Sequence, residues 1–234
     1  MKRVILKLSG EALASCNGAG ISAEKVKEVA YEIKALYEQG IQIGIVIGAG
    51  NIWRGRDAEE NGMERAAADY MGMLGTILNC LAMQNALESI GVDTRVMSAL
   101  NVPSVAEPYI RRKALKHFED NKIVIFAGGT GAPFFTTDTT SALRAAEMKA
   151  ECILMAKNGV DGVYNKDPRK HADAIRYETL TYDEMLAQHL QVMDLTAATL
   201  CNENDIKIIV FDMSKKGNIS KVVNEPTIGT IITK

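Results

Sequence analysis

Short apolar runs alternate with longer segments of helical periodicity along the whole chain. The runs fall at residues 3–8, 41–47, 94–97, 123–127, 152–156, 207–211 and 230–233. Several are apolar at almost every position, which is typical of strands in a parallel sheet that helices cover on both faces. The alternation therefore predicts βαβ units and an α/β fold with a largely parallel sheet.

The segment between the first two runs has the clearest helical face. Apolar side chains recur there at steps of three and four, at Val26, Val29, Ile33, Leu36 and Tyr37. Ser22 is suited to cap the start of this helix, and Gly40 to follow its end in a left-handed conformation. We therefore expect a helix with one apolar face.

A second helical segment covers residues 64–89. Its apolar stripe contains Met71, Leu74, Leu78 and Leu81. Gly72 and Gly75 interrupt it, and each lowers helix propensity by about 1 kcal/mol relative to alanine, which suggests close packing of the backbone against another helix or a ligand. The stripe fits either the protein core or an interface with another subunit.

Composition narrows the class of protein. The chain has 27 basic and 29 acidic residues and a net charge of −2, which disfavours nucleic acid or an anionic membrane as its main partner. Its four cysteines are scattered without CxxC spacing, and the N-terminal segment does not match a signal peptide, so we expect buried thiols in a cytoplasmic protein. No apolar run approaches the roughly 20 residues of a membrane-spanning helix. Because no repeat, linker or low-complexity tract divides the sequence, residues 1–234 are expected to form a single domain.

Three glycine-rich turns carry the strongest functional signal. They are LKLSGEA (6–12), IGAGN (47–51) and AGGTGAPFFTTD (127–138), and each follows an apolar run and precedes helical sequence. In an open parallel sheet such turns lie at the carboxyl ends of the strands, where ligands bind. Glycine lets backbone N–H groups approach a ligand, and a helix N-terminus favours an anion. Together the turns predict an anion-binding site.

The common nucleotide-binding motifs do not explain these turns. The chain has no GxxxxGK[ST] sequence, which excludes a P-loop enzyme. Residues 18–23 match GxGxxG/A, but they lie several residues beyond the first apolar run instead of directly after it. A dinucleotide site is therefore disfavoured.

Charged side chains beside the first two turns favour phosphate as the anion. Lys7 closes an apolar run and is followed by Ser9 and Gly10, so an ammonium group and backbone donors converge. A solvated surface lysine is the alternative, which its apolar neighbours disfavour. Arg54 and Arg56 follow the second turn, and Arg54 is favoured as the residue that grips phosphate.

Later segments add further candidates. Asp138 ends the third turn, either as a helix N-cap or as an anchor for a catalytic lysine or Mg²⁺. Lys157 and Asn158 end the fifth run. The segment DGVYNKDP is expected to form a turn, a short strand and a second turn, in which Tyr164 either stacks on a base or packs in a hairpin.

Histidine chemistry is missing from these segments. His117, His171 and His189 lie away from the glycine turns, and no Ser-His-Asp or HExxH arrangement can be drawn. Transfer of a phosphoryl group to an anionic acceptor needs positioning and charge neutralisation, not a general base. The candidate residues therefore suit phosphoryl transfer.

Six motifs together resemble the bacterial UMP kinases. They are KLSGEAL, VIGAGNIWRG, ADYMGMLGT, GGTGAPFFTTD, VDGVYNKDP and VMDLTA, and they run in order over nearly the whole chain. The resemblance implies the amino acid kinase fold, a three-layer αβα sandwich, and transfer of the γ-phosphoryl group of ATP to UMP with Mg²⁺ carried by ATP. It also implies a homohexamer, activation by GTP and inhibition by UTP.

The resemblance assigns residues to each substrate. The N-terminal part is expected to bind mainly UMP and the C-terminal part mainly ATP. Catalytic roles are implied for Lys7, Arg54, Asp138 and, more loosely, Lys157. The implied ATP-binding residues are Lys7, Leu8, Ser9, Gly10, Gly50, Arg54, Asn158, Tyr164 and Asp167. The implied UMP-binding residues are Ala49, Asp69, Thr130, Gly131, Ala132, Pro133, Phe134, Phe135, Thr136 and Thr137.

The same comparison of motifs singles out further positions. Asp194 matches an acidic residue that organises the site. The segment that aligns with the GTP-linked region contains Ser15, Cys16, Asn17, Gly18, Ala19 and Gly20. Two residues depart from the family pattern: Ala49 replaces a glycine, which adds a methyl group next to UMP, and Ala132 replaces an asparagine, which removes an amide.

Two other functions stay open at this point. A related kinase of the same superfamily would act on a carboxylate or carbamate, and Asp69 with PFFTTD favours UMP over that reading. A nucleotide-binding storage or sensor protein on the same fold would have lost transfer, and the presence of Lys7, Arg54 and Asp138 speaks against it.

Overall fold

A single twisted sheet organises the computed structural model, which describes residues 1–15, 18–55, 62–190 and 192–234. In these residues the strand order is β4-β3-β5-β2-β1-β6-β8-β9-β7. Every pairing is parallel except that of β8 with β9. The predicted largely parallel sheet is therefore confirmed.

The seven predicted strands are present within a residue or so of their expected ends. They are β1 (Arg3–Leu8), β2 (Gln42–Ile47), β3 (Thr94–Ser98), β5 (Ile123–Ala127), β6 (Cys152–Lys157), β8 (Lys207–Asp212) and β9 (Thr230–Thr233). Two short edge strands, β4 (Glu107–Pro108) and β7 (Thr179–Thr181), lie at the two ends of the sheet and were not predicted. The strand expected around Tyr164 is wrong, since Tyr164 forms only an isolated bridge with Arg176.

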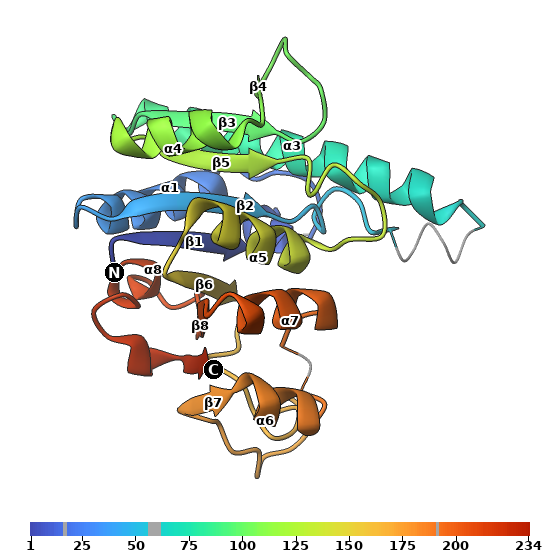
Figure 1. The fold of residues 1–234 in the computed structure, drawn as a ribbon, viewed down its shortest axis with the longest axis vertical. Helices are drawn as coiled ribbons and strands as arrows, with labels where there is room; N and C mark the ends of the chain where they lie inside the picture. The colour runs from blue at the N-terminus through green and yellow to red at the C-terminus, as the bar shows by residue number, and fades with distance from the viewer. Residues whose placement is uncertain (16–17, 56–61, 191) are drawn as a thin grey trace.

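Helices cover both faces of this sheet, so the αβα arrangement is confirmed. The helices are α1 (Ala23–Tyr37), α3 (Arg65–Ser89), α4 (Arg111–Glu119), α5 (Thr137–Met148), α6 (Tyr182–Ala187), α7 (Leu195–Glu203) and α8 (Asn218–Lys221), with 3₁₀ turns η1 (Gly10–Leu13) and η2 (Pro226–Ile228). One core lies under α1, α3 and α8, and a second lies under α4 to α7. Figure 1 shows α5 and α7 side by side on one face of the sheet, and α1 and α3 on the other.

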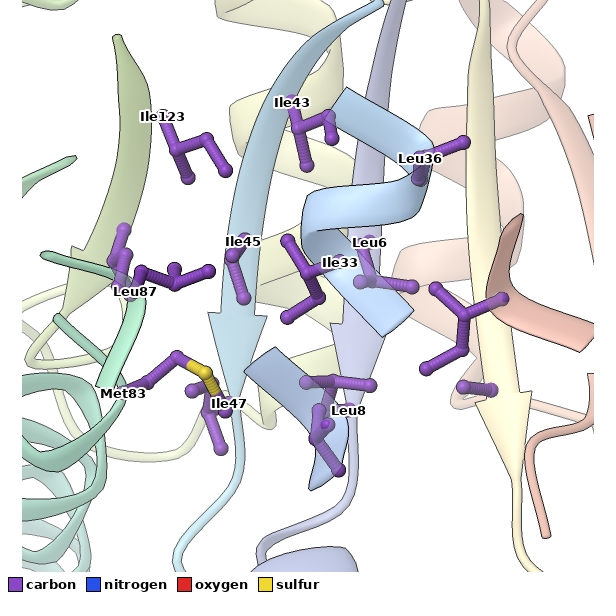
Figure 2. Close-up of a cluster of buried hydrophobic side chains, with 14 of the residues drawn as sticks. Leu6, Leu8, Ile33, Leu36, Ile43, Ile45, Ile47, Met83, Leu87 and Ile123 are labelled. Carbon is purple, nitrogen blue, oxygen red and sulfur yellow. The ribbon is translucent and has the colours of Figure 1, made fainter. Parts of the chain in front are cut away.

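The first core explains why α1 forms where it does. Ile33 and Leu36 are fully buried, and Figure 2 shows Ile33 lying between Ile45 of β2 and Leu6 of β1. Fully burying an aliphatic side chain of this size stabilises the fold by about 1.5–3 kcal/mol. The Ser22 hydroxyl accepts a hydrogen bond from the Lys25 N–H at the helix start, as predicted.

Three of the four residues of the predicted stripe on α3 lie on its exposed side, while Leu81 packs against the first core. Met71, Leu74 and Leu78 are exposed by 40%, 50% and 52%, and Leu81 is only partly buried. The face that packs on the sheet is instead made of smaller and polar residues together with apolar ones, namely Ala68, Met73, Gly75, Thr76, Ile77, Asn79, Cys80, Met83 and Leu87. Of the two readings given to the stripe, the core reading is wrong.

Three cysteines lie in the described part of the chain, and all are buried free thiols, at Cys80, Cys152 and Cys201. Burial raises the pKa of Cys152 and Cys201 to about 12, so these thiols stay protonated and unreactive at neutral pH. Cys16 lies outside the described residues. No helix in the described ranges has both the length and the apolar character that a bilayer crossing needs.

Candidate functional site

The three glycine turns lie side by side at the carboxyl ends of three neighbouring strands in the middle of the sheet. The turns follow β1, β2 and β5, which are consecutive neighbours in the strand order. Contact between the first two is close: a β-carbon on Gly10 would lie 2.5 Å from the Gly48 carbonyl oxygen and 2.8 Å from the Gly50 nitrogen. No larger residue fits there, so Gly10 is required by packing as well as by any ligand.

Lys7 is held beside the first turn of α5 by the alternation of side chains along β1. Ile5 and Lys7 share the strand face that α5 covers, since Ile5 belongs to the second core. The Lys7 Nζ lies 2.8 Å from the Asp138 Oδ1, with both side chains largely buried. The structure therefore brings together a lysine and a carboxylate that the sequence separates by more than a hundred residues.

Lys157 lies on the same face as Lys7, at the end of the neighbouring strand β6. Its ammonium group donates to the Val192 carbonyl at 3.0 Å. Burial, reinforced by repulsion from Lys7 and opposed by attraction to Asp138, lowers the pKa of Lys157 below the ordinary value for lysine. Two cations held close in a partly dry site would be stabilised by a bound polyanion.

The start of α5 is fixed by hydroxyl and carboxylate groups. Thr136 is the N-cap, and its hydroxyl oxygen accepts from the Asp138 and Thr139 N–H groups. Asp138 is thus not the cap, and its carboxylate is available to Lys7. Asp194 caps α7 through the Ala197 N–H and also accepts hydrogen bonds from the hydroxyls of Thr136 and Thr139, which ties α7 to α5.

A cavity of about 650 Å³, which we call the Lys7 cavity, opens on one side of the Lys7–Asp138 pair. Among the candidates, its lining contains Lys7, Ser9, Lys157, Asn158, Tyr164 and Asp167. Tyr164 is oriented by its hydroxyl, which donates to the Asp161 Oδ1 at 2.7 Å. Asp167 accepts from the Arg169 N–H at 3.0 Å and so organises the loop that closes the cavity.

Other candidates for the same ligand lie just outside that lining. The side chain of Leu8 is fully buried in the first core, which leaves only its backbone for a ligand. Gly50 lies beside Glu11, and Arg54 forms an ion pair with Glu11 while donating from Nε to the Gly50 carbonyl at 3.3 Å. Arg54 is half exposed. Arg56 lies outside the described residues.

A smaller cavity of about 160 Å³, the Asp69 cavity, lies beyond the start of α5. Its lining includes seven of the candidate residues: Ala49, Asp69, Thr130, Ala132, Phe135, Thr136 and Thr137. The Asp69 carboxylate accepts from the Phe134 N–H at 2.7 Å and from the Arg65 guanidinium. It therefore joins α3 to the third glycine turn.

Three residues of the third turn do not line the Asp69 cavity. They are Gly131, Pro133 and Phe134, and Phe134 is 65% exposed with the Arg65 guanidinium 5.9 Å from its ring centre. Gly131 has a φ of +83°, which favours glycine at that position.

The segment predicted to be linked to GTP is only partly described. Cys16 and Asn17 lie outside the described residues. Ser15 donates from its N–H to the Ala19 carbonyl, and Gly18 and Gly20 both have positive φ angles. Gly20 donates to the Asn51 carbonyl at 2.7 Å, so this loop contacts the second glycine turn.

Several residues that line the two cavities were missed by the sequence analysis. Glu11 and Arg169 line the Lys7 cavity, and Trp53, Met73 and Thr140 line the Asp69 cavity. Position in a motif was the only available signal for Glu11 and Trp53, which lie inside KLSGEAL and VIGAGNIWRG. Met73 lies inside ADYMGMLGT in the same way, whereas Arg169 and Thr140 carry no such signal.

The fold and the site together define an α/β phosphotransferase without a P-loop. Two lysines, glycine turns and helix starts converge between two cavities, and the described residues contain no group of three or more His, Cys, Asp or Glu side chains placed to hold a metal. The family comparison agrees: the model of the amino acid kinase family matches residues 2–212. The chain belongs to the amino acid kinase family.

Individual similar proteins share a more specific activity than the family as a whole. A uridylate kinase from onion yellows phytoplasma (strain OY-M) is 56% identical over 233 residues, which is 99% of this chain and 97% of that protein. The crystal structure of a UMP kinase from Bacillus anthracis superposes with a TM-score of 0.96 at 42% identity, covering 99% of this chain and 96% of the other. A UMP kinase structure from Ureaplasma parvum gives a TM-score of 0.96 at 41% identity, with coverage of 100% and 99%.

Proposed function

We propose that this chain is a UMP kinase, which transfers the γ-phosphoryl group of ATP to UMP and releases ADP and UDP. The observation that carries the proposal is the Lys7–Asp138 ion pair. Lys7 lines the larger cavity, and Asp138 directly follows Thr136 and Thr137, which line the smaller one. The uridylate kinases that match over the whole chain support the same reaction.

The Lys7 cavity is the proposed ATP site. Its size suits a nucleoside triphosphate, with Asn158, Tyr164 and Asp167 around the base and ribose. Backbone donors of Ser9 and Gly10 would meet the phosphates at the end of β1. Gly50 and Arg54 would approach them from the second turn, which requires Arg54 to exchange Glu11 for phosphate.

The Asp69 cavity is the proposed UMP site. Asp69 would accept hydrogen bonds from the ribose hydroxyls, and the 130–137 loop would surround the nucleotide. In this division the N-terminal part would bind mainly UMP, through α3 and the 130–137 loop, although its first two glycine turns also reach the ATP phosphates. The chain after β6 would bind mainly ATP, within one domain.

Transfer then depends on charge and position. Lys7 and Lys157 would stabilise the charge on the transferring phosphoryl group, which is the largest source of catalysis in such reactions. Asp138 would hold Lys7 in line between the two substrates. The acceptor is the UMP phosphate oxygen, which carries a negative charge already and needs no general base.

Mg²⁺ is proposed to enter with ATP, and the residues present fit it. The buried Asp138 Oδ1 faces the Lys7 ammonium group, and carboxylate oxygen is a preferred ligand of Mg²⁺. When bound, Mg²⁺ would neutralise phosphate charge.

Assembly and regulation extend the proposal. We propose a homohexamer, activated by GTP and inhibited by UTP, that acts in the cytoplasm, where ATP and UMP are made and used. The exposed apolar stripe on α3 supports contact between subunits. The 15–20 loop, which contacts Asn51, is the proposed GTP-linked region.

A coupled ADP-release assay tests the reaction directly. The purified chain is given ATP and Mg²⁺ with UMP, CMP, dCMP, AMP, carbamate or N-acetylglutamate, with and without GTP. We expect release with UMP well above the other acceptors. Release only with carbamate or the carboxylate would overturn the proposal in favour of a related kinase, and binding without release would indicate a nucleotide sensor.

A further inference from the structure

Helix α3 carries two buried polar side chains in the middle of the face that packs on the sheet. Thr76 is 4% exposed and Asn79 is fully buried, between apolar neighbours such as Ile77 and Cys80. A buried polar group that loses its partner costs more than an ordinary hydrogen bond contributes, so both residues need a compensating role. Thr76 also lines the Asp69 cavity, but its hydroxyl is engaged with the protein backbone, and Asn79 lines neither cavity.

Asn79 holds the second glycine turn through an amide pair. Its Nδ2 donates to the Gly48 carbonyl at 2.7 Å and to the Asn51 Oδ1 at 2.8 Å. Asn51 returns a bond to the Asn79 Oδ1 at 3.0 Å and donates to the Gly20 carbonyl at 2.8 Å. Because the Gly48 and Gly20 carbonyls can only accept hydrogen bonds, each must face an NH₂ group, so the orientation of both amides is determined.

Thr76 holds the third glycine turn. Its hydroxyl oxygen accepts from the Gly128 N–H at 2.9 Å, and the hydroxyl proton is donated to the Met73 carbonyl at 2.6 Å. Gly128 has a φ of +74°, and the chain from Gly129 onward lines the Asp69 cavity. A single hydroxyl thus fixes the point where the third turn leaves β5.

We infer that Thr76 and Asn79 are positioning residues that set the spacing of the glycine turns, with Thr76 acting on the acceptor side alone and Asn79 acting on both substrates. The difference arises from what each turn contacts. Gly48 and Asn51 pack against Gly10, which lies in the chain between two residues that line the Lys7 cavity. They also flank Ala49, which lines the Asp69 cavity. The inference rests on the proposed function, in that UMP is taken as the ligand of the Asp69 cavity.

The test compares Thr76→Val with Thr76→Ser. Valine has nearly the shape of threonine but cannot bond Gly128, whereas serine can. We expect Thr76→Val to raise the KM for UMP about tenfold, with kcat and the KM for ATP within about twofold of the parent, as fits the loss of one buried hydrogen bond. Thr76→Ser should restore the KM for UMP.

A matched control and a second variant complete the design. Thr94→Val removes another buried hydroxyl, which donates to the Val92 carbonyl at the start of β3, and should change neither KM. Asn79→Leu should raise both KM values. If Asn79→Leu does not fold, the Thr76 series decides alone. An unchanged KM for UMP in Thr76→Val, or an equal change in Thr94→Val, would overturn the inference.

Amide hydrogen exchange separates this inference from the proposed function. In the substrate-free protein, the Gly128 amide should exchange at least tenfold faster in Thr76→Val than in the parent or Thr76→Ser. An unchanged exchange rate would contradict the inference. Absence of UMP-dependent ADP release in the parent protein would reject the proposed function, whatever the exchange rate shows.

Discussion

The Lys7 cavity and the Asp69 cavity differ in both size and chemistry. The first is about 650 Å³, and its described lining holds three lysines, one arginine and two carboxylates. The second is about 160 Å³ and is lined mainly by small residues, threonines and one carboxylate. Charge favours binding and transfer of phosphate, while a small cavity lined mainly by uncharged groups discriminates by shape. The contrast indicates that one side of the site supplies the chemistry and the other selects the acceptor.

The largest expected effect comes from removing the charge at the boundary of the two cavities. Lys7→Ala should lower kcat by about 10²–10³-fold or more, because in the proposed mechanism its largely buried ammonium group would stabilise the transferring charge. UMP binding should be largely intact. Steady-state kinetics with ATP and UMP measure this, with Lys27→Ala on the exposed surface of α1 as the control. Normal turnover by Lys7→Ala would reject the assignment of the site.

A second variant tests the Asp69 cavity, the proposed site of the acceptor. Asp69→Asn should raise the KM for UMP by about tenfold or more, because a neutral amide is a weaker acceptor for ribose hydroxyls than a carboxylate. The KM for ATP should change little. Asp183→Asn, exposed on α6, is the control for loss of one carboxylate. Equal changes in both KM values would remove the proposed division of the two cavities.

The third prediction concerns shape alone. A β-carbon on Gly75 would lie 2.9 Å from the Ala49 Cβ, so Gly75→Ala should destabilise the protein by about 1–3 kcal/mol through overpacking and narrow the Asp69 cavity. The double variant Gly75→Ala with Ala49→Gly should recover the lost stability. Urea unfolding measures both.

Gly72→Ala is a matched control on the same helix. Its nearest neighbour would be the Trp53 Cδ1 at 3.8 Å, an ordinary contact, so the higher helix propensity of alanine should stabilise α3 by up to about 1 kcal/mol. If Gly72→Ala and Gly75→Ala behave alike, the close approach of Gly75 to Ala49 is not what requires glycine there.

The smallest expected effect is on stability and depends on pH. Because burial and the nearby Lys7 lower the pKa of Lys157, the folded state binds fewer protons than the unfolded state between the lowered pKa and the ordinary value of 10.5. Lys157 therefore destabilises the substrate-free protein below its folded pKa, and this cost fades as pH rises toward 10.5. Lys157→Met should be more stable than the parent at pH 7, with a difference that shrinks at high pH. A difference that grows with pH would contradict this.

The fold was largely predictable because the strands are apolar and the helix between the first two is well marked. Lys7 could be picked out as a candidate site residue for the same reason, because a lysine within an apolar strand is unusual. Its pairing with Asp138 was one of two open readings, and the structure decides it through the side-chain alternation of β1 and the Thr136 cap.

Helix α3 shows why the rest was not predictable. Three of its large apolar side chains, at Met71, Leu74 and Leu78, lie on the exposed face. Thr76 and Asn79 face the sheet, in the company of buried apolar side chains such as Ile77 and Met83. Periodicity identifies the face with the most hydrophobic residues, but here the buried face needs small and polar groups to approach the glycine turns. The partners that make these polar groups tolerable come from strands distant in sequence.

The most direct measurement of the proposed division is a calorimetric titration of UMP and of a non-hydrolysable ATP analogue with Mg²⁺ into the parent, Lys7→Ala and Asp69→Asn. The account predicts a crossed pattern: Lys7→Ala weakens binding of the ATP analogue and spares UMP, and Asp69→Asn weakens UMP and spares the analogue. Loss of both ligands in either variant, or the reverse pattern, would contradict it.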